Sequence, residues 1–132
     1  ASDLTGEYRM FTRHHKVWPR ELPKTMTLPQ TSLFTNLEIS ALRIGGTTLV
    51  SLPGEIMLEI GRQVEGGLAG NTIVLGYTNG NAGYLCTQRA YDEGGYEPTC
   101  FFRTYLHPAP FTRNTEKILV RTGIRTGKKV AE

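Results

Sequence analysis

The residues best suited to chemistry are tyrosines on a glycine-rich stretch. Residues 76–98 read GYTNGNAGYLCTQRAYDEGGYEP and hold four of the chain's six tyrosines: Tyr77, Tyr84, Tyr91 and Tyr96. Glycine lets the backbone approach other groups closely, and tyrosine supplies a rigid ring with a hydroxyl of pKa about 10. Such phenols suit the lining of a pocket. The alternative is that they cover the edge of a core, which is what we expect of Tyr77 and Tyr91.

A carboxylate follows a sharp turn earlier in the chain. In SLPGE, residues 51–55, a strand is expected to end at Pro53 and Gly54, and Glu55 stands where a helix is expected to begin. A strand-to-helix turn at the carboxyl edge of a sheet is where α/β proteins place reactive groups. The alternative is that Glu55 only complements the helix dipole, worth about 0.3 to 1 kcal/mol. The local pattern alone favours this alternative.

Histidines and cysteines add little to a metal site. His14 and His15 are adjacent in an expected strand, so their side chains would point to opposite faces and could not easily share one metal. His107 lies in LHPAP, a predicted loop, where we expect a solvated residue rather than a ligand. Cys86 and Cys100 permit at most one disulfide and show no CxxC spacing, which leaves their pairing open.

Hydrophobic spacing predicts the elements that position these residues. Residues 37–41 alternate apolar and polar positions, a glycine pair follows at 45–46, and TTLVSL comes next, so we expect a β-hairpin. Ile56, Ile60 and Val64 fall four apart, which indicates a helix that begins near Glu55 and stops at the next glycine pair. NTIVLGY then has the continuous apolar run of a buried strand.

The rest of the chain predicts shorter elements and a closing helix. Thr87 can cap a short helix over QRAYDE, TCFFRTYL has β character, and EKILVRTG predicts a helix weakened by Gly123 and Gly127. The fold class is therefore α+β, with mixed α and β elements. It comprises a β-hairpin followed by a helix, a buried strand, a glycine- and tyrosine-rich loop, and a C-terminal helix packed on a sheet.

Length and charge limit the class of protein. A chain of 132 residues with 39% hydrophobic content predicts one domain, or part of one. Residues 1–34 read as an irregular, extended segment, and residues 35–132 as the α/β part. The net charge is +3, and charges of both signs are mixed along the chain except in the terminal RTGIRTGKK, so we do not expect a nucleic-acid partner. No apolar run approaches a transmembrane segment, and we expect a soluble protein.

Two motif groups resemble a known family. LRIGGTTLVSLPGEIMLEIGRQV and VLGYTNGNAGYLCTQRAYDEGGYE resemble the distal part of the catalytic region in the neutral (alkaline, non-lysosomal) ceramidase family. The match covers about residues 37–97, close to half the chain. The family's PGE turn corresponds to residues 53–55, its GYxNxxxxY segment to residues 76–84, and its YE pair to residues 96–97. The segment after Tyr96 matches no family motif closely.

The resemblance implies zinc chemistry. By residue-for-residue correspondence Glu55 and Tyr84 are expected zinc ligands, and Tyr96 is the expected catalytic residue beside the metal, steadying the substrate carbonyl or its oxyanion. The family's remaining ligands are histidines far upstream, and its GDxSPN-type segment also has no counterpart here. Catalytic zinc usually has three protein ligands. The implied site in this chain is therefore incomplete.

The function expected from the resemblance is amide hydrolysis. The chain would be a portion of a larger zinc-dependent amidohydrolase, a hydrolase of lipid metabolism that cleaves an N-acyl, sphingolipid-type amide with metal-activated water. Its partners would be the lipid amide substrate, zinc and the upstream part of the same catalytic domain. The family resemblance allows a secreted or periplasmic location. The alternative is a non-catalytic interaction module that retains the family scaffold.

Overall fold

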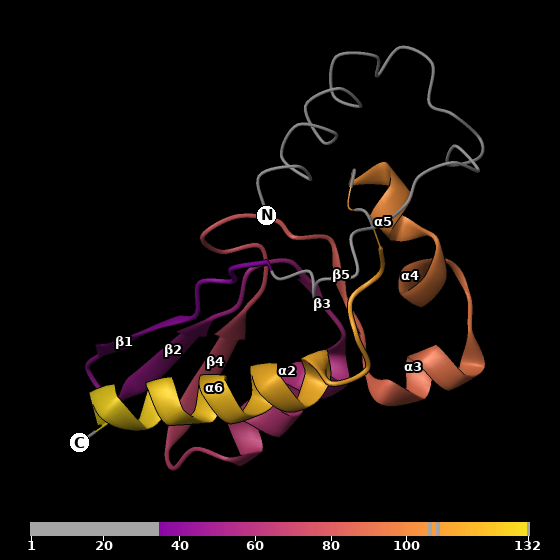
Figure 1. Cartoon of the computed structure of the whole chain (residues 1–132). Helices are drawn as coiled ribbons and strands as arrows, with labels where there is room; N and C mark the ends of the chain where they lie inside the picture. Colours follow the sequence, from indigo (N-terminus) through magenta and orange to yellow (C-terminus); the bar gives the residue numbers. More distant parts are fainter. Residues whose placement is uncertain (1–34, 106, 108, 132) are drawn as a thin grey trace.

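A β-hairpin and one further strand form the main sheet (Figure 1). The computed structural model describes residues 35–105, 107 and 109–131, so the predictions for segment 1–34, including His14 and His15, lie outside the described residues. Strands β1 (Ser40–Ile44) and β2 (Thr47–Ser51) pair antiparallel, and β4 (Asn71–Leu75) lies parallel to β2. The predicted hairpin is confirmed.

A second, two-stranded sheet lies beyond the carboxyl end of β2. Strands β3 (Glu55–Ile56) and β5 (Tyr84–Leu85) pair in parallel, and helix α2 (Leu58–Gly66) follows β3. The prediction that the helix begins near Glu55 is wrong, since α2 starts three residues later and Glu59 is the acidic residue of its first turn. The Glu55 amide donates instead to the Gly83 carbonyl at 2.9 Å, which draws residues 55–56 into a strand.

Short helices connect the small sheet to the closing helix. Thr87 caps α3 (Gln88–Glu93), as predicted, by accepting a hydrogen bond from the Ala90 amide at 3.2 Å. The predicted β segment TCFFRTYL is wrong, because α4 (Tyr96–Thr99) leads directly into α5 (Phe101–Thr104), which buries both of its phenylalanines. No helix in the described ranges is long and apolar enough to cross a membrane.

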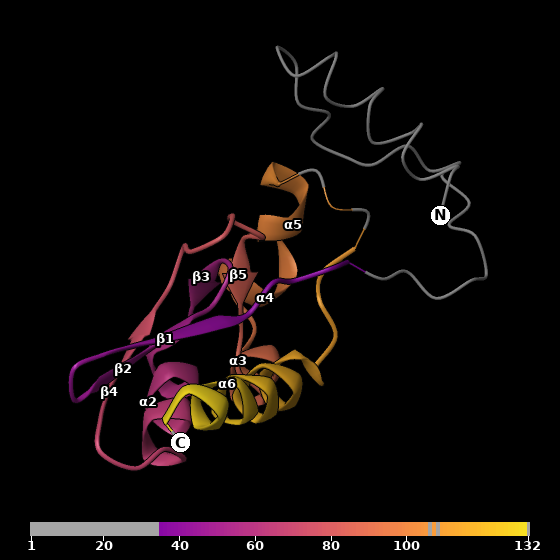
Figure 2. The same cartoon turned by 90° about the vertical axis from the view of Figure 1, so that its left-hand side faces the viewer.

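Helices α2 and α6 (Thr115–Ala131) pack on one face of the main sheet (Figure 2). Their contact with β2 forms the core, which contains the following buried residues: Val50, Leu52, Ile60, Val64, Leu85 and Leu119. The glycines of α6 permit this packing. A Cβ on Gly123 would lie 3.1 Å from Val64, and one on Gly127 would lie 2.6 Å from Leu68. The predicted C-terminal helix is therefore confirmed, and the α+β class with it.

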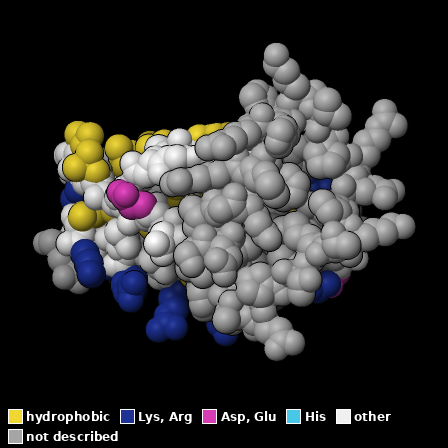
Figure 3. Space-filling model, turned by 45° about the horizontal axis from the view of Figure 1, so that its top comes forward, with side chains coloured by type: hydrophobic (Ala, Val, Ile, Leu, Met, Phe, Trp, Pro, Cys, Tyr) yellow, Lys and Arg dark blue, Asp and Glu magenta, His cyan; other side chains and the backbone are white. Residues whose placement is uncertain are grey.

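The opposite face of the main sheet is exposed. Leu42, Ile44 and Ile73 are 57%, 61% and 44% exposed, and Figure 3 shows apolar side chains gathered at the upper left, over the hairpin end of the molecule. The prediction that the strand in NTIVLGY is buried is wrong, since β4 is an edge strand with Ile73 and Leu75 exposed. Within the continuous apolar run, alternate side chains therefore lie on the packed face and on the exposed face of the sheet.

Candidate functional site

The PGE turn is held between two glycine-containing loops. The Tyr77 amide donates to the Gly54 carbonyl at 2.9 Å, while the next amide, that of Glu55, is bonded to Gly83. Gly54 has a φ of +129°, and a Cβ there would lie 2.6 Å from the Gly83 carbonyl oxygen. Only glycine allows this approach without a backbone shift. The turn therefore brings the ends of β2 and β4 against the segment that enters β5.

Glu55 and Tyr84 are register partners in the β3–β5 pair. Partners in neighbouring strands project their side chains to the same face of a sheet, and hydrogen bonding to the Glu55 carboxylate raises the pKa of the Tyr84 hydroxyl. The predicted meeting of these residues is confirmed. Their role as zinc ligands stays a prediction.

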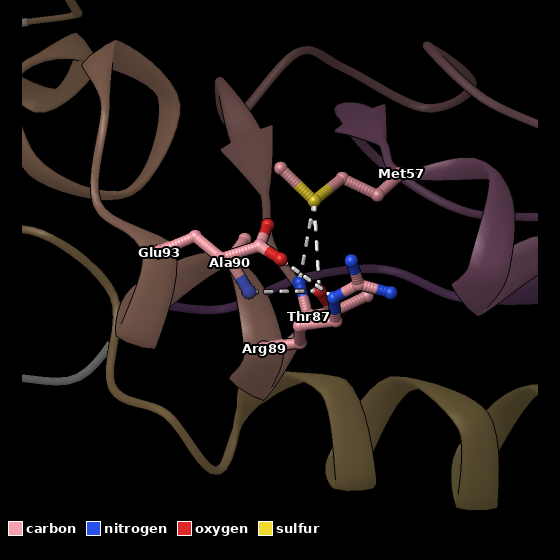
Figure 4. A network of polar contacts seen from close by, with 5 residues as sticks. All are labelled: Met57, Thr87, Arg89, Ala90 and Glu93. Carbon is pink, nitrogen blue, oxygen red and sulfur yellow. Dashed lines mark hydrogen bonds and ion pairs between the residues drawn. The ribbon is translucent and has the colours of Figure 1, made fainter.

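The downstream end of this pair is fixed by a sulfur contact. The Thr87 amide donates to the Met57 sulfur at 3.5 Å, and the Thr87 hydroxyl approaches the same atom at 3.8 Å (Figure 4). Met57 is the residue before α2, and Thr87 is the cap of α3. The contact joins the starts of the two helices that follow β3 and β5, so it helps to keep the two strands in register.

Three phenols surround the Glu55 carboxylate. Burial tends to raise the pKa of Glu55, but hydrogen bonds from the hydroxyls of Tyr105, Tyr77 and Tyr84 outweigh it and lower the pKa below its usual value. The same bonds stabilise the protonated phenols: the hydrogen bond to Glu55, with partial desolvation and its negative charge, raises the pKa of Tyr77 to about 12. The site thus holds an ionised carboxylate among neutral phenols.

Tyr105 is a site residue that the sequence did not indicate. Its hydroxyl donates to Glu55 Oε1 and accepts from the Asn81 side-chain amide at 3.1 Å. Its ring stacks on His107, with centroids 6.4 Å apart and planes 12° apart. Tyr105 lies directly after α5, in a segment expected to form a strand, so no local pattern placed its hydroxyl near Glu55. Tyr77, expected to cover a core edge, is instead 60% exposed and joins the same carboxylate.

The remaining candidates lie beside this cluster. The Tyr96 ring meets the Tyr84 ring edge-on at 6.1 Å, and its hydroxyl is hydrogen-bonded to Thr104 at 3.1 Å. Tyr96 is 48% exposed and stands one ring away from Glu55. Tyr91 fits its expected local role, since its hydroxyl donates to the Phe111 carbonyl at 2.7 Å.

His107 and the cysteines have structural surroundings. A ring nitrogen of His107 lies 2.9 Å from the Ala82 carbonyl oxygen, and the ring is half-buried, so the expectation of a solvated histidine is wrong. Through this contact the His107 ring nitrogen is bound to the loop that carries Gly83. Cys86 and Cys100 are free, and burial raises the pKa of the Cys86 thiol to about 11. Cys86 is therefore a neutral core residue at pH 7.

A pocket of about 600 Å³ opens beside the carboxylate. It is lined by Glu55 and Tyr84, by the apolar side chains of Ile56 and Leu58, and by the face of α2 that follows. Figure 1 shows the elements that frame it, with β3 and β5 above the start of α2. The Glu55 carboxylate is thus accessible to a ligand and lies next to an apolar wall, as a site for an amphipathic molecule requires.

The donor set is compatible with part of a zinc site. A carboxylate oxygen is an accepted zinc ligand, and the lowered pKa of Glu55 keeps it ionised at neutral pH. The Tyr84 oxygen lies beside it as a second donor. Within the described part of the chain, histidine, cysteine, aspartate and glutamate form no cluster of three or more that could hold a metal. Glu55 and Tyr84 are thus compatible with two of the ligand positions around a zinc ion.

Comparisons of the chain with protein-family models, with curated proteins and with solved structures find no match. The features of the chain that bear on its function are therefore the site itself and the motif resemblance to the neutral ceramidases.

Proposed function

We propose that the chain is part of a zinc-dependent amidohydrolase similar to the neutral ceramidases, with an N-acyl, sphingolipid-type amide as substrate. The observation that carries the proposal is the register pairing of Glu55 with Tyr84 at the mouth of an apolar-walled pocket. These two residues would hold the metal, and the remaining ligands would come from an upstream part of the same catalytic domain. Zinc, when bound, polarises an amide carbonyl and lowers the pKa of water to about 7.

The chain's own residues supply positioning around that chemistry. Tyr105 and Tyr77 orient the Glu55 carboxylate through their hydroxyls. Tyr96 stands against the Tyr84 ring, from where its phenol would donate a hydrogen bond to the oxygen of the scissile carbonyl. Ile56 and Leu58 line the neighbouring pocket and would exclude water from the aliphatic part of the substrate. A secreted or periplasmic location, which the resemblance allows, remains part of the proposal.

The test is hydrolysis of a short-chain N-acyl sphingosine by the complete protein in the presence of zinc. Glu55→Gln should reduce kcat/KM by at least a hundredfold and leave the melting temperature within a few degrees. Tyr96→Phe should lower kcat more than it raises KM, since its hydroxyl would act on the developing oxyanion. Tyr91→Phe is the matched control, because its hydroxyl bonds to a backbone carbonyl away from the site. Retained activity in Glu55→Gln would reject the proposal.

The exposed sheet face supports a second candidate function, that of a non-catalytic interaction module. Leu42, Ile44 and Ile73 form an apolar patch on the face opposite α2 and α6. Patches of this kind often mark protein interfaces. On this alternative, Glu55→Gln would leave partner binding intact and Leu42→Glu would abolish it, which separates the two candidates.

A further inference from the structure

The outer face of α6 holds a row of cations. Its exposed positions repeat at intervals of three and four residues, and they include the following side chains, which we name the cationic row: Lys117, Arg121, Arg125, Lys128 and Lys129. At 3.6 residues per turn the row falls within about 120° of the helix circumference, and it is about 18 Å long at 1.5 Å per residue. Figure 3 shows Lys and Arg side chains in a line along the lower left edge of the molecule.

Acidic side chains do not neutralise the cationic row. Glu116, the acidic residue in the first turn of α6, lies outside the arc of the row. Its two carboxylate oxygens accept hydrogen bonds from the Gln63 side chain at 2.7 Å and from the Gln88 amide at 2.6 Å. In the described part of the chain, both salt bridges join residues outside α6. The row therefore concentrates positive charge on one side of the molecule.

The stability of α6 does not account for the cationic row. Lys128 and Lys129 lie in the last turn, where cations complement the helix dipole, but Lys117 lies in the first turn, where the dipole disfavours a cation. Four members of the row also follow one another at intervals of four residues, and like charges at that spacing destabilise a helix. Binding of an anionic partner would relieve this repulsion.

An apolar side chain stands among the cations. Ile118 lies within the same arc of α6 and is 58% exposed. A branched aliphatic side chain gains free energy when it leaves water, whereas a nucleic-acid backbone offers mainly phosphates and sugars. Helix α6 also has no aromatic side chain on which a base could stack. A lipid surface supplies both anionic headgroups and an apolar region beneath them.

We propose that the cationic row and Ile118 form a docking surface for a membrane that contains anionic lipids. The Lys and Arg side chains would bind the headgroups, and Ile118 would enter the boundary between headgroups and acyl chains. The helix would stay on the sheet, because Leu119 on its opposite face is part of the core. The choice of a lipid surface rests in part on the proposed function, since an N-acyl sphingolipid is itself a membrane component.

Vesicle sedimentation with the complete protein tests this docking surface. The probes are vesicles of phosphatidylcholine alone and vesicles that also contain roughly 30% phosphatidylserine, with EDTA present so that no zinc-dependent step contributes. Wild-type protein should bind the anionic vesicles at least tenfold more tightly than the neutral ones. Raising NaCl from about 0.1 to 0.5 M should weaken this binding, because salt screens exposed charges.

Three variants separate the contributions of charge and apolar contact. Arg121→Gln/Arg125→Gln should weaken binding to anionic vesicles at least tenfold, since each Lys or Arg near an anionic surface contributes about fivefold. Ile118→Ser should weaken it severalfold. Arg89→Gln/Arg103→Gln removes the same charge from exposed positions on α3 and α5 and should bind as wild type does. Because all these side chains are exposed, the variants are expected to fold, which their melting temperatures would verify.

Equal binding of neutral and anionic vesicles, absence of binding, or unaltered affinity in either Arg121→Gln/Arg125→Gln or Ile118→Ser would overturn the inference. Tighter binding of a DNA duplex than of the anionic vesicles would also overturn it and identify a nucleic-acid site instead. None of these results bears on the role of zinc, which EDTA removes. Conversely, Glu55→Gln should bind vesicles as wild type does, and hydrolytic activity retained in that variant would reject the proposed function while leaving the docking result intact.

Discussion

Glu55 and Tyr84 are opposite each other in a pairing of only two residues per strand, and hydrogen bonding to the Glu55 carboxylate raises the pKa of the Tyr84 hydroxyl. The pairing joins the turn after β2 to the loop before α3. Backbone bonds on either side of Tyr84 hold the two strands together, since the Glu55 amide donates to the Gly83 carbonyl and the Met57 amide to the Leu85 carbonyl. A carboxylate and a phenol fixed in this way form a preorganised pair of oxygen donors.

The pairing should fail when the turn cannot close. Gly54→Ala introduces a methyl group 2.6 Å from the Gly83 carbonyl oxygen at a φ of +129°. We expect it to lower the free energy of unfolding by about 2 kcal/mol or more, because clash and backbone strain add. Urea denaturation would measure this loss. Gly46→Ala, where a Cβ meets no atom within 4 Å, should change stability little and serves as the control.

The phenols should control the ionisation of Glu55. Since hydrogen bonds lower its pKa in the folded state, they stabilise the fold above the unfolded pKa of glutamate, and this contribution is lost as pH falls through the lower folded value. Tyr105→Phe should therefore raise the pKa of Glu55 and reduce the dependence of stability on pH in the acid range. Carboxyl ¹³C NMR titration would report the pKa, and an unchanged value would show that Tyr105 does not hold the carboxylate. Tyr91→Phe should have no effect.

The close packing of α6 against its neighbours should require glycine at the contact positions. Alanine normally favours a helix over glycine by about 1 kcal/mol. At Gly123 the added methyl would lie 3.1 and 3.2 Å from the two methyl groups of Val64, which is fully buried and branched. We expect Gly123→Ala to destabilise the protein despite its better helix propensity. Gly66→Ala at the end of α2 meets open space and should be neutral or stabilising in the same thermal melts.

Local patterns predicted the parts of the fold that local forces decide. The hairpin, the Thr87 cap and the closing helix have turn, capping or periodic signals in their own residues. Strand β3 was missed because Ile56 fits the four-residue spacing of Ile60 and Val64, whereas its strand conformation depends on a partner from β5. The β propensity of Phe101 and Phe102 was likewise overridden by their burial in the short helix α5.

The site was predicted only in part, because some of its contacts join residues that are distant in the sequence. Motif spacing indicated Glu55, Tyr84 and Tyr96, and the structure places all three in one region. Tyr105 reaches Glu55 only through the course of α4 and α5, and its separation of 50 residues leaves no periodic signal.

Zinc binding by the complete protein, in which the upstream ligands are present, tests the central claim most directly. Calorimetric titration of zinc at neutral pH should show uptake that Glu55→Gln and Tyr84→Phe each weaken at least tenfold, because each removes or alters one of the two donors. Tyr91→Phe should bind as wild type does, since its hydroxyl is occupied by the Phe111 carbonyl. Zinc affinity that is the same in all four proteins, or no uptake by any of them, would contradict the assignment of Glu55 and Tyr84 to a metal site.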